Sequence, residues 1–183
     1  QKARALSAQT AESDQVRFLV GTQSLKAENQ VHHIDFDDEN NQISKNVFLH
    51  RLGEIWHLSA STIDKNLLAT CYNKTSESKA EMCAAVWRLP SDFDTLQSED
   101  HTSHQSLELV CDLTASDFGD MKSVLWHPTG DSSNLVGIAD SHILVWDLET
   151  SSASASCIEI CVIMNCVLKQ SITVSCEHVY SNK

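Results

Sequence analysis

Short apolar runs separated by polar segments recur along most of the chain in a fixed order. Three of these runs carry an aromatic residue near their end: Trp87 in 84–89, Trp146 in 142–148, and Phe36 in 30–36, which we expect to take the position of the tryptophan in the first unit. A second apolar run precedes each of them, at 17–21, 66–70 and 134–138. A third kind of run, at 53–60 and 123–130, precedes the last two pairs. A unit of several strands is therefore repeated about three times.

These runs predict strands and not helices, because they are short, rich in β-branched and aromatic residues, and bounded by Gly, Asn, Asp or Pro. Within 143–146, apolar residues point to both sides, as expected for a strand covered on both faces. The closing aromatic residues are somewhat farther apart than the roughly 40 to 45 residues of a minimal WD-repeat blade. The excess lies in two polar inserts, 75–81 and 91–105.

The pattern predicts an all-β fold, a partial WD-repeat β-propeller of about three four-stranded antiparallel blades. A β-sandwich remains the alternative fold. It predicts alternating polar and apolar faces, and it gives no reason for a triplet of strands to recur.

The third unit is the most complete. Residues 126–130 predict an inner strand that leaves into a Pro-Gly turn, 135–139 the next strand, 140–141 a tight turn, and 142–148 a strand that ends in Trp-Asp. In the WD-repeat family, Asp140 matches the turn aspartate that ties a blade together, with Trp146 packing near it. Because no Gly-His dipeptide occurs in this chain, we expect the usual network of His, Ser or Thr, Asp and Trp to be incomplete.

Length and composition suggest how the chain is divided. A closed propeller needs at least four blades, so three blades predict a ring that is not closed. We expect a fragment, or a variant with a replaced C-terminal end, with N-terminal blades in 1–150 and a divergent Ser/Cys-rich tail in 151–183. The apolar segment 157–168 in this tail is expected to form a strand or helix that has no partner in a blade. Its cysteine spacing does not form two C-x-x-C pairs, which argues against a zinc site.

The formal net charge of −12 argues against binding to nucleic acid or to anionic membranes, which requires clustered Lys and Arg. The acidic stretch 35–39 lacks the ligand pattern of a calcium loop and predicts a solvated turn. Seven cysteines at irregular spacing, without an N-terminal apolar signal, favour reduced thiols in the cytosol. No apolar run is long enough to span a bilayer, so direct membrane insertion is not expected.

Motifs for catalysis are missing from the sequence. It contains no phosphate-binding Gly-rich loop, no G-x-S-x-G elbow and no H-E-x-x-H pair. Of the nine histidines, His32, His33, His57, His127 and His142 fall on the predicted strands or their ends, which favours structural roles. We therefore expect a protein that is not an enzyme, with no catalytic, cofactor-binding or metal residues and no cofactor.

Several phrases in fixed order carry a resemblance to a known family. They lie at 3–11, 17–25, 34–40, 53–57, 70–73 and 139–148. Over about residues 3 to 150, the chain resembles the WD-repeat proteins that interact with the GARP and EARP tethering complexes. The resemblance implies a seven-bladed, non-enzymatic scaffold, cytoplasmic and peripheral at the trans-Golgi network and recycling endosomes. It further implies roles in endosomal recycling, endosome-to-Golgi retrograde transport and the sorting of dense-core vesicle cargo.

Two other functions remain open at this point. A substrate-recognition propeller of a ubiquitin ligase would need a basic or aromatic pocket, and the sequence shows no arginine cluster to form one. A hydrolytic propeller would need converging acidic or histidine ligands. For partner contacts, the inserts 75–81 and 91–105 are candidates by exposure alone.

Overall fold

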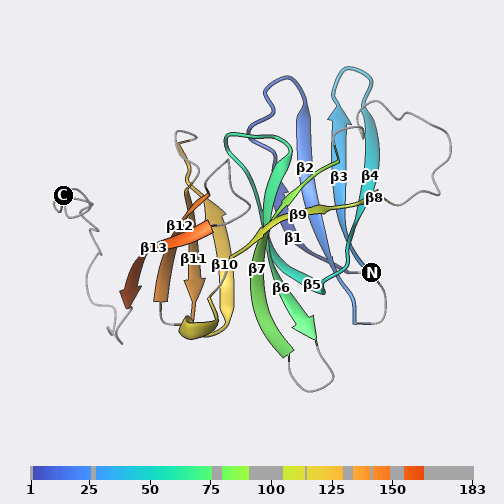
Figure 1. Cartoon of the computed structure of the whole chain (residues 1–183). Coiled ribbons are helices and arrows are strands. Elements are labelled where there is room, and N and C mark those ends of the chain that lie inside the picture. Colours follow the sequence, from blue (N-terminus) through green and yellow to red (C-terminus); the bar gives the residue numbers. More distant parts are fainter. Residues whose placement is uncertain are drawn as a thin grey trace, which may run out of the picture.

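The chain folds into three antiparallel sheets that follow one another in sequence (Figure 1). The computed structural model describes residues 2–25, 28–75, 80–90, 105–113, 115–129, 134–140, 142–148 and 155–162. The first sheet contains β1 (Lys2–Ala8), β2 (Val16–Gln23), β3 (Asn29–Asp37) and β4 (Gln42–His50), with the short β8 (Gln105–Ser106) parallel to β4 at its edge. The second contains β5 (Glu54–Ala60), β6 (Leu67–Thr75), β7 (Ala80–Arg88) and β9 (Glu108–Asp112), and the third β10 (Met121–Trp126), β11 (Asn134–Ala139), β12 (His142–Leu148) and β13 (Ala155–Val162).

The sheets pack face to face in chain order, with the second sheet in the middle. Strand β5 contacts β1 and β2 of the first sheet and β10 of the third. The first strand of each sheet is therefore an inner strand, and β1, β5 and β10 lie next to one another. This arrangement confirms the predicted all-β partial propeller. The one helix in the described residues, η1 (Ser116–Phe118), is a single short turn, and no helix there is suited to cross a bilayer.

Two separate apolar layers hold the sheets together. The layer between the first and second sheets contains Leu19, Phe48 and Trp87, and the layer between the second and third contains Val86 and Trp146. Burial of such side chains contributes about 1.5 to 3 kcal/mol each. The neighbouring residues Val86 and Trp87 lie in different layers, so the second sheet is covered on both faces by other described residues.

The outer faces of the first and third sheets have no covering sheet among the described residues. Leu6 and Ile43 on the first sheet are 68% and 71% exposed, and Leu125 and Ile138 on the third are 53% and 38% exposed. The sheets of the described chain do not close into a ring, as predicted. The expectation that residues 143–146 are covered on both faces is met on one face only, where Leu144 and Trp146 are buried.

The strand register shows which residues are equivalent in the three sheets. One backbone hydrogen bond recurs just after each inner strand: the N–H donors belong to Gln9, Ser61 and His127, and the acceptors are the carbonyls of Arg17, Leu67 and Asn134 at 3.0, 2.9 and 3.0 Å. The residues that follow these acceptors are Phe18, Leu68 and Leu135, and they are therefore equivalent.

This register confirms one part of the predicted alignment and corrects another. Trp87 pairs with Leu68 and Trp146 with Leu135, so the two tryptophans occupy equivalent positions. Phe18 pairs with Ile34, whereas Phe36 pairs with Val16. The prediction that Phe36 takes the place of the tryptophan in the first unit is wrong, because the backbone pairing puts Ile34 there.

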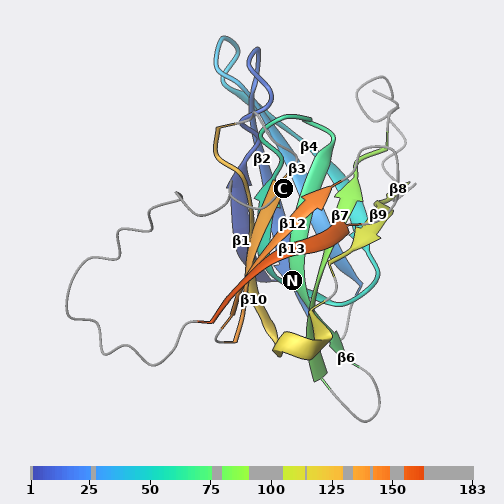
Figure 2. The same ribbon diagram turned by 60° about the vertical axis from the view of Figure 1, so that its left-hand side comes forward.

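Part of the segment after residue 150 belongs to the third sheet. Strand β13 pairs antiparallel with β12 along its length and supplies the fourth strand (Figure 2). The prediction that the apolar segment 157–168 has no partner in a blade is wrong for 157–162, because the backbone there belongs to β13 and pairs with β12. The division of the chain at residue 150 stays a prediction based on composition.

Candidate interaction surface

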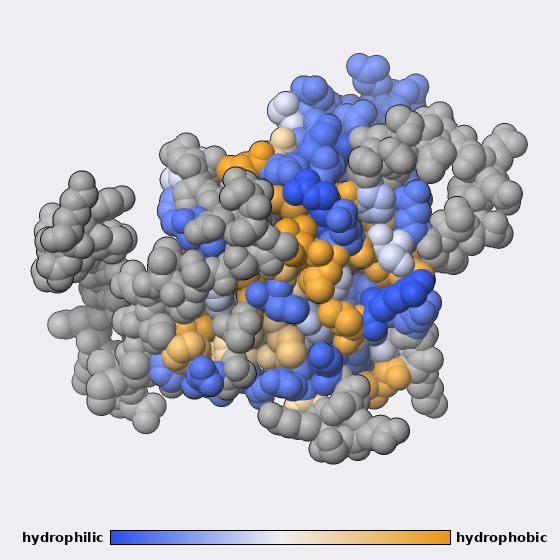
Figure 3. All heavy atoms as spheres, in the orientation of Figure 1, coloured by the Kyte–Doolittle hydropathy of each residue, from blue (hydrophilic) through white to orange (hydrophobic). Residues whose placement is uncertain are grey.

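The sheets have two ends, and the connections at each end differ in character. We call the end where β1, β5 and β10 begin the entry end; it carries the β2–β3, β4–β5 and β9–β10 connections. The opposite end carries the β1–β2, β3–β4 and β5–β6 connections. In the space-filling view, the protruding hairpin tips of the first sheet are hydrophilic, and apolar side chains gather toward the middle of the face (Figure 3).

A β-bulge recurs at the same step of all three inner strands near the entry end. The strand pairing skips one residue in each sheet: Arg4 in β1, Trp56 in β5 and Lys122 in β10. A bulge increases the local twist and redirects the side chain of the extra residue. The guanidinium carbon of Arg4 lies 4.1 Å from the centroid of the Trp56 ring, a cation–π contact between neighbouring sheets. No pattern in the sequence indicated these bulges.

A buried polar network anchors the β4–β5 connection to the second sheet. The indole N–H of Trp87 donates to Thr70 Oγ1 at 2.8 Å, and His50 Nε2 lies 3.1 Å from the same hydroxyl. His50 Nδ1 lies 3.2 Å from the carbonyl oxygen of Gly53. A carbonyl only accepts, so Nδ1 carries the proton, and the Thr70 hydroxyl donates to Nε2. Burial lowers the pKa of His50 to about 4, which keeps this ring neutral.

This network contains three of the four residue types of the usual WD-repeat network. The histidine of that network usually follows a glycine, whereas His50 follows Leu49. The described residues contain its His, Thr and Trp members, and the turn between β6 and β7 lies outside them, so the expectation of an incomplete network stays a prediction. The equivalent of Thr70 in the third sheet is Gly137, which has no hydroxyl. There the space is filled by apolar atoms, since a Cβ on Gly137 would lie 2.6 Å from Cζ3 of Trp146.

A pocket of about 230 Å³ opens at the entry end, between the first and second sheets. Its walls come from the β2–β3 connection, the β4–β5 connection and the last residues of β6; they include Ser24, Glu28, Arg51, Gly53, Glu54 and Asn73. The Glu54 side chain is buried, and its Oε2 accepts a long hydrogen bond of 3.4 Å from Asn73 Nδ2. Oδ1 of Asn73 is buried without a hydrogen-bond partner. Two side chains that line the pocket, Glu54 and Asn73, therefore carry acceptor oxygens that receive few hydrogen bonds from the described residues.

Gly53 lets the pocket wall approach the second sheet closely. Its φ of 146° lies in the range that favours glycine, and a Cβ there would lie 1.9 Å from the carbonyl oxygen of Asn73. The β4–β5 connection is thus held from two sides, by this backbone contact and by the hydrogen bond from His50. The pocket wall is built on fixed backbone and not on a free loop.

Asp140 ties the third sheet together at the entry end, as the resemblance implied. Its Oδ2 accepts from the backbone N–H of Asp120 at 3.1 Å, and Lys122 Nζ lies 3.0 Å from Oδ1. The hydrogen bond from Lys122 lowers the pKa of Asp140. This ion pair is exposed and screened by solvent, so it contributes little to stability. Trp146 packs against Gly137 on the neighbouring strand.

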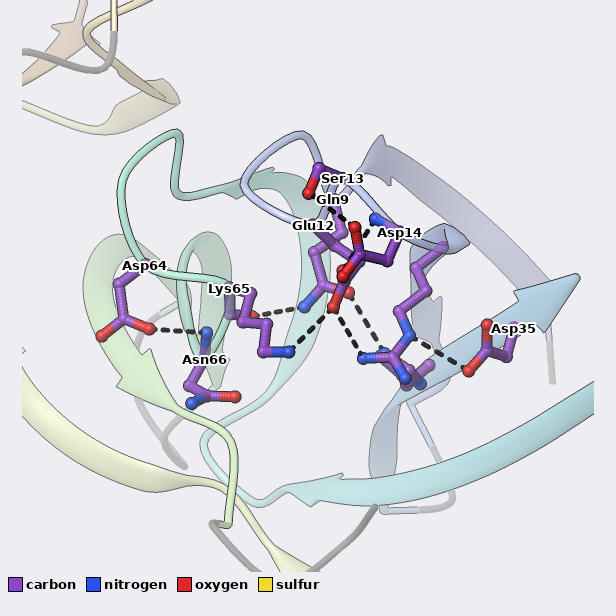
Figure 4. Close-up of polar contacts among 10 residues, drawn as sticks. Gln9, Glu12, Ser13, Asp14, Asp35, Asp64, Lys65 and Asn66 are labelled. Carbon is purple, nitrogen blue, oxygen red and sulfur yellow. Dashed lines mark hydrogen bonds and ion pairs between the residues drawn. The ribbon is translucent and has the colours of Figure 1, made fainter.

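A charged cluster at the opposite end joins the β1–β2 and β5–β6 connections (Figure 4). Glu12 Oε2 lies 3.3 Å from Arg17 Nη1 and 2.9 Å from Lys65 Nζ, and Arg17 Nε donates to Asp35 Oδ2 at 3.0 Å. The Lys65 hydrogen bond contributes most to lowering the pKa of Glu12. The Gln9 side chain donates to the carbonyl of Lys65 and also contacts His33. These charges satisfy one another, which indicates a structural cluster between two sheets.

The other histidines considered from the sequence have mainly structural surroundings. His33 is buried beside Gln9, and burial lowers the pKa of His32 and of His57. His127 contacts the Thr129 hydroxyl at 2.9 Å, and the His142 ring packs against Phe118. Within the described ranges, no three His, Cys, Asp or Glu residues come together as a metal site.

The remaining sequence candidates are spread over the chain. The acidic stretch 35–39 ends β3 and enters a turn, where Asp37 accepts from the backbone and the side chain of Asn40 at 3.0 and 2.7 Å. Cys71, Cys83 and Cys111 are free thiols, and burial raises the pKa of Cys71 to about 12. The central parts of the inserts 75–81 and 91–105 lie outside the described residues, so the proposal of partner contacts there stays a prediction.

Three consecutive sheets, two of four strands and one of four strands with the short β8 added at its edge, are joined through inner strands with matching bulges and define the chain as part of a β-propeller. A family model described as EIPR1 beta-propeller matches residues 1–176, and the chain belongs to this family. The match extends past residue 150, where the sequence resemblance was expected to end.

The chain is also similar to curated proteins of several organisms. It is 58% identical over 158 residues to the EARP-interacting protein homolog of Gekko japonicus and 56% identical over 158 residues to the EARP and GARP complex-interacting protein 1 of Homo sapiens; each match covers 84% of this chain. The WD repeat-containing protein DWA2 of Arabidopsis thaliana is 32% identical over 154 residues, again 84% of this chain. The chain spans 41% of the length of each of these relatives.

Proposed function

We propose that this chain supplies N-terminal blades of a non-enzymatic propeller that binds the EARP and GARP tethering complexes. The observation that carries this proposal is the identity of 56% to 58% with proteins named for interaction with these complexes. The fold agrees with such a role, because propellers present rigid loop surfaces to partners.

The proposed setting follows from the same partners. The protein acts in the cytoplasm, peripherally at the trans-Golgi network and recycling endosomes. There it supports endosomal recycling, endosome-to-Golgi retrograde transport and the sorting of dense-core vesicle cargo. Neither the described residues nor the relatives' names favour the ubiquitin-ligase alternative, and we do not propose it.

A binding measurement with purified components tests this function. The whole chain is immobilised and incubated with purified EARP and GARP complexes, with an unrelated propeller as control. We expect enrichment of both complexes on the chain. If the chain recovers no more of either complex than the control propeller does, the proposal is contradicted for these N-terminal blades.

A further inference from the structure

The pocket at the entry end contains a buried carboxylate, Glu54, that has no cationic partner among the residues that the structure describes. Glu54 is 9% exposed, and its one hydrogen bond in the described structure is the contact from Asn73 Nδ2 at 3.4 Å. Arg51 lines the same pocket but forms no ion pair with Glu54 within the described residues. A buried charge without a counter-charge is costly, so its retention at a pocket favours a site that a cation fills.

Asn73 adds a second unsatisfied acceptor to the pocket. Its Oδ1 is buried without a partner, while its Nδ2 faces Glu54. Reversing the amide would place its oxygen against the carboxylate of Glu54, which is unfavourable, so the hydrogen-bond pattern fixes the orientation. The pocket is therefore lined by the carboxylate of Glu54 and, on the adjacent strand, by Asn73, whose buried amide oxygen has no donor among the described residues.

The volume limits the size of the occupant. Small-molecule and cofactor pockets usually hold about 300 to 1,000 Å³, and this one holds about 230 Å³. A single long side chain with an ammonium or guanidinium head fits the volume and supplies several N–H donors to the two acceptors. The chain's net charge of −12 favours the approach of a basic segment.

We propose that this pocket receives one lysine or arginine side chain from a partner protein, with Glu54 and Asn73 as the residues that bind its cationic head. As a partner site, this inference rests on the proposed function. His50, Thr70 and Trp87 act as positioning residues, because their network and the close approach of Gly53 to Asn73 hold the pocket wall in place.

The first experiment tests the pocket without the tethering complexes. The probe is Nα-acetyl-lysine methylamide, and the matched control probe carries an acetyl group on Nε, which removes the charge. Backbone amide shifts of the ¹⁵N-labelled chain report binding. We expect saturable shifts at Gly53, Glu54 and Asn73 with the charged probe alone. Equal shifts with the acetylated probe, or no shifts at these residues, would overturn the inference.

Two matched variants distinguish binding by Glu54 from a general effect of the chain's negative charge. Glu54→Gln keeps the shape of the side chain and an oxygen that accepts from Asn73, so the fold should survive and the melting temperature should not fall. Glu39→Gln makes the same charge change in the β3–β4 turn at the opposite end. We expect Glu54→Gln to lower the affinity for the lysine probe about tenfold and Glu39→Gln to leave this affinity unchanged. Equal affinity for both variants would contradict the assignment of Glu54.

The same variants are then compared on the purified complexes. If the whole chain binds EARP or GARP, we expect about tenfold weaker binding for Glu54→Gln. Binding unchanged by Glu54→Gln would refute the pocket as the partner site and leave the proposed function intact. A chain that binds the lysine probe but neither complex would refute the proposed function and leave the basic-side-chain pocket intact.

Discussion

The second and third sheets place a tryptophan at the same point of their architecture but hold it in different ways. Trp87 donates to Thr70, whose hydroxyl also pairs with the neutral His50. Trp146 instead lies over Gly137, in a space that a single methyl group would disturb. One position in a blade can thus be held by a hydrogen-bond network or by close apolar packing. Only the first solution brings a titratable group into the core.

The largest expected effect tests the packing solution. Trp146 is 1% exposed, and Trp146→Ala should lower the free energy of unfolding by about 3 to 5 kcal/mol, because it leaves a large cavity beside Gly137. Urea unfolding followed by circular dichroism measures this loss. A midpoint near that of the wild type would show that the third sheet is not packed on the second.

A pH dependence should mark the network of the second sheet. The pKa of His50 falls from 6.5 to about 4 on folding, so between these values the unfolded state binds more protons. The contribution of neutral His50 to the free energy of unfolding is complete above pH 6.5. It is lost as the pH falls toward 4, for a total loss of about 3 kcal/mol. His32 and His57 contribute with the same sign, because burial lowers their pKa as well.

Urea unfolding at several pH values between 4 and 7.5 measures this dependence. His50→Gln isolates its share, and we expect a smaller loss of stability on acidification in this variant. An unchanged slope would mean that His50 takes up its proton without disturbing the network.

Removal of one hydroxyl should break the network without a change of volume. Thr70→Val leaves the indole N–H of Trp87 and Nε2 of His50 without their partner, at an expected cost of about 2 kcal/mol. Thr62→Val serves as control, because the Thr62 hydroxyl donates to the carbonyl of His127 in a partly buried connection. A cost no larger than that of the control would show that the network adds little to stability.

The smallest expected effect comes from adding one methyl group to the third sheet. Gly137→Ala should cost about 1.5 kcal/mol, because its Cβ meets Trp146 at 2.6 Å and Met121 Cε at 2.9 Å. In the Trp146→Ala background the same substitution should cost clearly less, since the opposing ring is gone and the flexible end of Met121 can move into its space. An equal cost in both backgrounds would place the strain in the backbone and not in this contact.

Much of the fold follows from apolar periodicity, but not all of it. Strands β2, β3, β5 to β7 and β10 to β12 match predicted runs, because both layers need apolar side chains from them. The outer strands were harder to foresee. The first half of β4 is exposed, so it shows no apolar run. Strand β13 pairs with β12, but the two strands lie on opposite sides of the change in composition after residue 150. Pairing of the backbone decides these strands, and side-chain hydrophobicity does not.

The candidate surface was largely hidden from the sequence for a similar reason. The pocket joins Glu54 and Asn73, which are adjacent through strand pairing and far apart in the chain. The absence of a Gly-His dipeptide did not indicate the network around His50, because the network needs the histidine and not a glycine before it. The offset between Ile34 and Phe36 arose because aromatic character does not fix register.

The matching bulges in β1, β5 and β10 have a consequence for how this surface can change. The extra residue of each bulge is not paired with a residue of the next strand. Arg4, Trp56 and Lys122 therefore occupy the same position in the three sheets, although their side chains differ in chemistry. Substitutions at these three sites therefore leave the backbone pairing within each sheet in place, while they remove the contact of Arg4 with Trp56 or the ion pair of Lys122 with Asp140. They are natural points for re-engineering partner preference, or for attaching a spectroscopic label, in an otherwise rigid scaffold.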